Sequence, residues 1–261
     1  MFSLLKRSLV LVALGAVFSC GHYTGEEVVE YSLPNIWPDY REVTVPLNIA
    51  PLNFTVEKTF SYLEAVVVGT DGTVLKGSGK RVIRFSLRRW KQLLEKNAGN
   101  SLQITVRGRT GKKWHKYPSF TIYVSDRPID HGLVYRHIAP GYEVYSKVDI
   151  YQRELFSFRT RAIYENTLIP QTCVNCHSFK QGDPEYLTLH VRGEKGATVL
   201  QKEGTFRYLD SRSDSTSTAF SYPSWHPGGR FIAYSLNRTY QSFHVTSEDR
   251  VEVYDLVSDI V

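Results

Sequence analysis

Methionine and cysteine are scarce in this chain of 261 residues, which has one methionine, Met1, and three cysteines. Long apolar runs are also missing, because the run at residues 9–18 is shorter than the roughly 20 residues that a membrane-spanning helix needs. No nucleophile-elbow, HExxH or phosphate-loop motif is present. These absences argue against a spanning helix and against the catalysis that such motifs carry.

The short apolar run has the features of a secretory signal. Lys6 and Arg7 precede it, and the segment ends in "AVFSC", which resembles a bacterial lipobox. In a lipobox the cysteine is lipid-modified and becomes the new N-terminus. We therefore predict a signal peptide over residues 1–19 and a lipidated Cys20. A cleaved signal that leaves Cys20 unmodified is the alternative.

The predicted lipid places the protein in the cell envelope. Acyl chains on Cys20 would anchor the chain to a membrane, with residues 20–35 as a polar tether and the domains outside the cytoplasm. Gly21 follows the cysteine, and the absence of an aspartate there favours the outer membrane over the inner one.

The charge balance gives little indication of a nucleic-acid partner. The formal net charge is +6, and Lys6 and Arg7 leave with the signal, so the mature chain is only mildly basic. Its densest basic stretch, residues 106–117, is centred on a Thr-Gly turn and predicts a solvated hairpin tip. Acidic glycans or anionic lipid could use this patch, but nucleic acid is not expected outside the cytoplasm.

Residues 36–126 predict an immunoglobulin-like β-sandwich. Short apolar or alternating runs occur at 41–56, 62–69, 80–87, 101–108 and 118–125. The Asp-Gly pair in "TDGT" at 70–73 is typical of a tight hairpin. One amphipathic helix is expected over 86–99, with Ser86 as its N-cap and Gly99 as its stop.

The rest of the chain changes character twice. Residues 127–219 are aromatic-rich and weakly periodic, and we expect an ordered connector there that carries the motif described next. Residues 220–261 combine two apolar strands with a Pro-Gly-Gly turn, like one β-propeller blade. A propeller needs about four to eight blades, so this blade would be incomplete. The expected fold class is mainly β.

The segment "CVNCH" is the sharpest motif in the chain, with Cys173, Cys176 and His177 in the spacing of covalent c-type haem attachment. On a helical turn, cysteines three apart project from one face and could bond both vinyl groups of a porphyrin edge, while the histidine ligates iron. A disulfide is the first alternative in an exported chain. A zinc site would need further ligands from histidines, and coincidence is improbable because cysteine is rare.

Methionine scarcity then limits the second axial ligand of the iron. Met1 is lost with the signal, so a His/Met pair is not available in the mature chain. A second histidine, an open iron face or a less usual ligand remains. His190 ranks first because it lies thirteen residues after His177, and His226 and His244 follow. For each of these histidines, an ordinary structural or surface role is the competing interpretation.

Several stretches together resemble a known family. They are "PDYREVTVPLNIAPLNF", "APGYEVYSKVDIYQREL", "CVNCHSF", "YPSWHPGGRFIAYSLNRTYQSFH" and "VEVYDLVSDIV". In this order they resemble bacterial envelope lipoproteins labelled TolB-like or cytochrome c biogenesis proteins. The resemblance covers nearly all of the mature chain. It implies one haem c per chain at Cys173, Cys176 and His177 and a C-terminal propeller, although relatives of this kind continue into further blades.

The sequence therefore predicts a haem c-binding envelope lipoprotein that transfers single electrons or senses redox state. Its expected partners are the membrane and an unidentified envelope or redox protein. A non-redox binding lipoprotein with a protein or glycan partner is the alternative, in which Cys173 and Cys176 form a disulfide or hold a structural haem. We do not expect an enzyme, and a haem peroxidase is a minor alternative because it needs an open iron face.

Overall fold

The computed structural model describes residues 26–138, 147–209, 220–246 and 251–261. The predicted signal peptide, Cys20 and the first part of the tether lie outside these residues. The described chain divides into two compact units, and the second begins at Asp126 and also includes Pro46–Ala50. This division lies next to the domain boundary suggested at 126–127. The predicted connector and the predicted blade belong to one and the same unit.

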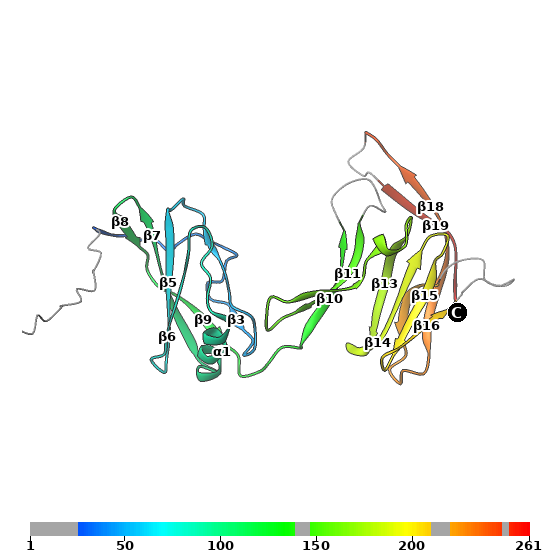
Figure 1. The fold of residues 1–261 in the computed structure, drawn as a ribbon, viewed down its shortest axis with the longest axis horizontal. Coiled ribbons are helices and arrows are strands. Elements are labelled where there is room, and N and C mark those ends of the chain that lie inside the picture. Colours follow the sequence, from blue (N-terminus) through cyan, green and yellow to red (C-terminus); the bar gives the residue numbers. More distant parts are fainter. Residues whose placement is uncertain (1–25, 139–146, 210–219, 247–250) are drawn as a thin grey trace, which may run out of the picture. The chain divides into compact units, whose positions relative to one another are not determined.

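The first unit is built on one large sheet with the strand order β1-β8-β7-β5-β6, in which β9 also pairs with β7 and β3 (Figure 1). The same unit contains a second sheet of two strands, β2-β4. The strands are β1 (Glu27–Val29), β2 (Ile36–Trp37), β3 (Thr44–Val45), β4 (Thr55–Val56), β5 (Tyr62–Gly69), β6 (Val74–Gly79), β7 (Ser101–Thr110), β8 (Lys113–Lys116) and β9 (Phe120–Val124).

Alternation along the strands explains this sheet. In β5 and β7 every second side chain is buried, so one face of the sheet packs into the core and the other faces solvent. The predicted hairpin at 70–73 is confirmed, with Gly72 at a φ of 81° in the turn between β5 and β6. The hairpin predicted in the basic stretch is also present, between β7 and β8.

The predicted helix is confirmed as α1 (Leu87–Lys96), whose buried face consists of Trp90, Leu93 and Leu94. Its spacing of apolar residues at three and four positions buries one stripe against the sheet. Ser86 occupies the N-cap without a side-chain cap bond. The strand expected at 80–87 is wrong: only isolated bridges occur there, Phe54 with Ile83 and Ser78 with Arg84, because the helix begins at Leu87 and shortens the run.

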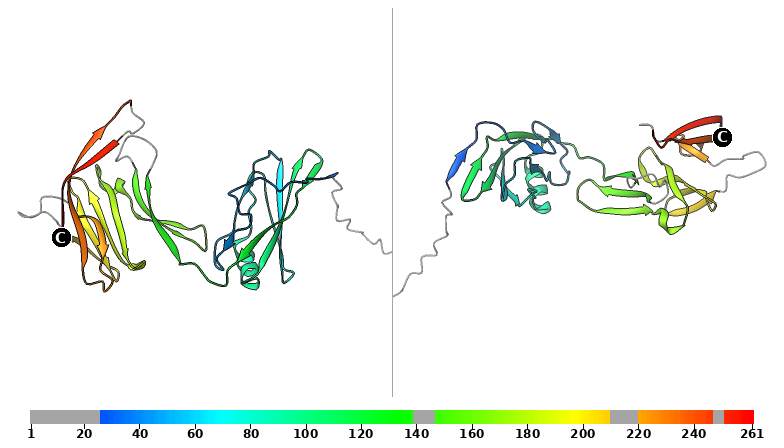
Figure 2. Two further views of the ribbon diagram at one scale, coloured as in Figure 1. Left: turned by 180° about the vertical axis from the view of Figure 1, so that it is seen from behind. Right: turned by 90° about the horizontal axis from the view of Figure 1, so that it is seen from above.

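The second unit contains three antiparallel sheets in chain order (Figure 2). The first has the order β10-β11-β12, the second β13-β14-β15-β16 and the third β17-β18-β19. The strands are β10 (Gly132–Ile138), β11 (Val148–Glu154), β12 (Thr160–Tyr164), β13 (Cys173–Lys180), β14 (Asp183–Arg192), β15 (Ala197–Lys202), β16 (Thr205–Leu209), β17 (Phe220–Trp225), β18 (Ile232–Phe243) and β19 (Val251–Ile260), with a short 3-10 helix η1 (Asn166–Leu168).

The region expected as a weakly periodic connector differs from that expectation, because its described residues form β10 to β16. In β11 the successive residues Val148, Asp149 and Ile150 are all buried, so the strand lacks the alternation of a half-exposed strand. Val148 and Ile150 pack with Val174 and Leu189 of the second sheet in one apolar cluster. Because β11 packs against another sheet in this way, apolar and polar residues do not alternate along its sequence.

The described part of the chain is mainly β, as predicted, with α1 as its one α-helix. Among these residues no helix has the length and apolarity to cross a membrane.

Candidate functional site

The "CVNCH" motif lies at the start of strand β13, which pairs antiparallel with β14. The expectation that the motif occupies a helical turn is therefore wrong. Asn175 pairs with His190 and Ser178 pairs with Thr188, so two residues, Cys176 and His177, lie opposite the single residue between those partners. This is a β-bulge, a feature that re-aims side chains and often occurs next to functional sites. The bulge, and not a helix, sets the directions of the motif side chains.

Cys176 has a left-handed backbone conformation, with a φ of 53°. In bulges of this kind the first residue is usually glycine, because a Cβ is crowded in the left-handed region. A cysteine at this position is a strained choice, and such strain is concentrated at functional sites. The chain thus keeps a thiol where backbone geometry favours glycine.

This strain gives a testable difference between two variants. We expect Cys176→Gly to be more stable than Cys176→Ala by about 0.5–1 kcal/mol, because only glycine fits the left-handed backbone without cost. At Asn175, one residue earlier in the paired strand, the order should reverse, with alanine the more stable. Urea denaturation of the four variants measures both differences, and the same order at the two positions would contradict the bulge.

A buried polar network fixes the chain just before the motif. The side chain of Asn166 accepts a hydrogen bond from the amide of Val148 at 3.1 Å and donates one to the carbonyl of Thr172 at 2.9 Å. The hydroxyl of Thr172 donates to the carbonyl of Ile169 at 2.7 Å. Asp149 accepts a bond from the amide of Asn166 at 3.2 Å. These bonds tie the start of β13 to the start of β11 and so position the motif.

Cys173 is 8% exposed and belongs to the apolar cluster between the first two sheets of this unit. Burial raises the pKa of its thiol, partly offset by Arg192 and Arg136, while the nearby Cys176 adds to the rise. The thiol is therefore protonated at neutral pH and poorly reactive in the folded chain. Cys176 is half-buried, and both cysteines are free thiols in the structure.

His177 is half-buried beside the backbone of Val134 in β10. Burial lowers its pKa, the backbone of Val134 opposes this change, and Arg136 lowers the pKa further. The imidazole is therefore neutral at neutral pH. The ring of Phe179 lies edge-on to it, with 6.5 Å between the centroids. A neutral imidazole has one ring nitrogen with an available lone pair.

His190 lies on β14, in the neighbouring strand, but its side chain belongs to the other face of the sheet. The residue opposite the bulge is Leu189, which packs in the apolar cluster, and neighbours on a strand point to opposite faces. His190 is 4% exposed, and its Nδ1 lies 3.0 Å from the hydroxyl of Thr198. The structure thus brings His190 close to the motif in the sheet without turning its ring toward His177.

Burial of His190 makes the protein sensitive to acid. Burial, helped by the charge of Arg192, lowers the pKa of His190 from 6.5 to about 4. Between these values the unfolded chain binds a proton that the folded chain does not. We therefore expect stability to fall as the pH drops from 6.5 to 4, by at most about 3 kcal/mol from this residue.

The measurement for this prediction is urea denaturation of the wild type and of His190→Gln at pH 7, 5.5 and 4, values chosen to span the two pKa values. The wild type should lose more stability than the variant over this interval. Equal losses in the two proteins would show that His190 does not have the lowered pKa.

The other two histidines proposed as second ligands are engaged locally. Nδ1 of His226 accepts a hydrogen bond from the amide of Gly228 at 3.0 Å, in the exposed turn after β17. Nε2 of His244 lies 2.9 Å from a carboxylate oxygen of Glu252. Both contacts are those of ordinary surface histidines.

Within the described ranges, no three side chains of His, Cys, Asp or Glu come close enough together to hold one metal ion. This requirement applies to a zinc site, where all ligands converge on the metal. A c-type haem makes a different demand, because the cysteines bond to the porphyrin edge and only the histidine reaches the iron. Cys173, Cys176 and His177 are donors of the types that such a haem uses.

Three residues that shape this site, Val134, Asn166 and Thr172, were missed by the sequence analysis. Val134 contributes its backbone, which no side-chain pattern can reveal. Asn166 and Thr172 are buried polar residues in and just after the short helix η1, a segment without periodicity; their closeness to Cys173 in the chain was the available signal.

No protein-family model and no curated protein matches this chain in sequence.

Proposed function

We propose that this chain is an envelope lipoprotein, anchored through Cys20, that binds one haem c through Cys173 and Cys176, with His177 as an iron ligand. Transfer of single electrons or sensing of redox state is the function that follows. The observation that carries the proposal is the "CVNCH" motif with His177 neutral and half-buried beside the backbone of Val134.

The residues around the motif support this role. The backbone of Val134 beside His177 would help to orient the imidazole, as second-shell carbonyls do for metal-bound histidines. Phe179 beside it would help to exclude water. When bound, haem supplies reversible one-electron chemistry at its iron. His190 is the weakest part of the assignment, since its ring belongs to the other face of the sheet.

Burial of Cys173 sets an order of events in the proposal. A thiol that is 8% exposed and packed among Val174, Leu189 and Ile150 cannot be reached without opening the cluster. Attachment would therefore precede the packing of β10–β12 against β13. The strained, more accessible Cys176 is the residue that remains reachable at a later stage.

The finer fold assignments are also part of the proposal. The first unit has one sheet face covered by its core, in keeping with an immunoglobulin-like sandwich. The strands β17, β18 and β19 form an antiparallel meander in residues 220–261, in keeping with an incomplete propeller blade. The preceding four-stranded meander β13–β16 has the strand number of one blade.

A pyridine haemochrome spectrum tests the proposal. The chain is exported through a cleavable signal and produced together with a c-type maturation system, and haem that survives acid-acetone extraction is the expected result. A colourless protein from cells in which a control cytochrome matures normally would overturn the proposal. The binding lipoprotein with unmodified cysteines would then be the working hypothesis.

A further inference from the structure

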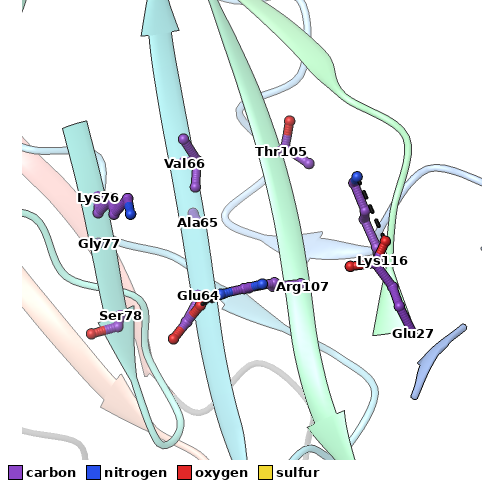
Figure 3. Close-up of a pocket in the computed structure, with 10 residues that line it drawn as sticks. All are labelled: Glu27, Glu64, Ala65, Val66, Lys76, Gly77, Ser78, Thr105, Arg107 and Lys116. Carbon is purple, nitrogen blue, oxygen red and sulfur yellow. Dashed lines mark hydrogen bonds and ion pairs between the residues drawn. The ribbon is translucent and has the colours of Figure 1, made fainter. Parts of the chain in front are cut away.

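The solvent-facing side of the large sheet in the first unit carries a hollow that is separate from the motif. Ala65 in β5 and Val106 in β7 are buried. Their neighbours in the sequence, Glu64, Thr105 and Arg107, therefore face away from the core. Figure 3 shows these side chains standing on neighbouring strands around one groove.

The groove has a volume of about 550 Å³, within the range of roughly 300–1,000 Å³ that is usual for small-ligand sites. Its floor includes small residues, and its walls are mostly polar. The lining contains three cationic side chains, two carboxylates and two hydroxyls: Lys76, Arg107, Lys116, Glu27, Glu64, Ser78 and Thr105. Such a surface offers both hydrogen-bond donors and acceptors, with a small excess of positive charge.

Arg107 is held in place before any ligand arrives. Its guanidinium bonds Glu64, with 2.6 Å from Nε to Oε2, and lies 4.6 Å from the centre of the Trp114 ring. On the other wall the hydroxyl of Tyr62 donates to Ser78 at 3.0 Å. Groups fixed in this way lose little conformational entropy on binding, which favours affinity.

Lys76 differs from the other cations of the groove. Arg107 is paired with Glu64, and Lys116 lies 3.7 Å from Glu27. Lys76 has no ion pair or hydrogen bond among the described residues, although its side chain is exposed at the groove on β6. It therefore supplies a positive charge that no group in the described part of the chain neutralises.

We propose that this groove binds an acidic oligosaccharide, one whose sugars carry carboxylates. Sugar hydroxyls both donate and accept hydrogen bonds, which matches the paired Arg107 and Glu64 and the hydroxyls of Ser78 and Thr105. The carboxylate of the sugar matches Lys76. A peptide that binds by strand addition would lie along the outer edge of β6, whereas the lining side chains stand on the face of the sheet.

The test is calorimetric titration of the whole mature chain with tetragalacturonate, with neutral maltotetraose and a tetra-aspartate peptide as comparison ligands. Tetragalacturonate should bind, and more weakly at high ionic strength. Lys76→Gln should weaken binding about fivefold, since a hydrogen bond to a charged group is lost. The matched control is Lys112→Gln, which removes the same charge from the exposed turn between β7 and β8 and should change affinity less than about twofold.

Arg107→Gln gives an independent check, with an expected loss of about tenfold, and its melting temperature shows whether the sheet stays folded. No binding of tetragalacturonate, or equal weakening by Lys76→Gln and Lys112→Gln, would overturn the proposal. Equal affinity for tetra-aspartate would also overturn it, because charge alone and not the sugar would then be recognised. Equal affinity for maltotetraose would overturn the requirement for the carboxylate.

Discussion

The Cys173→Ala, Cys176→Ala variant is expected to carry no covalent haem when it is produced with a c-type maturation system. Each single variant keeps one sulfur and should retain haem through one thioether, with a shifted haemochrome band because one vinyl group stays unsaturated. Both substitutions are conservative in volume. Loss of haem from the double variant would therefore report the missing bonds to sulfur and not an unfolded chain.

The matched control for this experiment is His190→Gln. Because its ring belongs to the sheet face opposite the bulge, we expect this variant to keep its covalent haem. Acid-acetone extraction followed by mass spectrometry of the peptide containing residues 173–177 measures attachment in every variant. Haem that stays with the double variant after extraction would show that the two sulfurs do not make the bonds.

Replacing Ile150 by alanine is expected to lower the free energy of unfolding of the second unit by about 3–4 kcal/mol. Ile150 is fully buried in β11 and packs in the cluster that contains Cys173, Val174 and Leu189. The loss combines the transfer of apolar atoms to water with the cavity that remains. A matched control is Leu133→Ala on β10, a residue that is 43% exposed and should cost less than about 1 kcal/mol.

Urea denaturation with amide hydrogen exchange at β11 and β13 assigns this loss to the second unit. A change below about 1 kcal/mol for Ile150→Ala would contradict the packed sheet and favour the ordered connector that the sequence predicted for residues 127–166. The same experiment tests whether the surroundings of Cys173 are held by β11, since exchange at β13 should accelerate together with that at β11.

The elements that the sequence predicted correctly are those with a strong local signal. Strand β5 alternates over its full length, and the Asp71-Gly72 pair demands a turn that few other residues can make. Helix α1 has its apolar residues at helical spacing. The strands β10 to β12 were missed because their buried and exposed residues do not alternate. Strand β11 begins with three buried residues in a row, and β10 and β12 have no buried residue, so no period of two stands out from the sequence.

The sequence by itself determined the chemistry that this chain offers: two cysteines and a histidine in the spacing of haem attachment, and no methionine after Met1 as a second iron ligand. Only the tertiary structure decided how those groups are presented. The bulge at Cys176, the half-buried position of His177 beside β10 and the burial of Cys173 all depend on the register between β13 and β14 and on the packing of another sheet. Contacts between strands distant in sequence fix that register, and a one-residue shift would send each side chain to the other face.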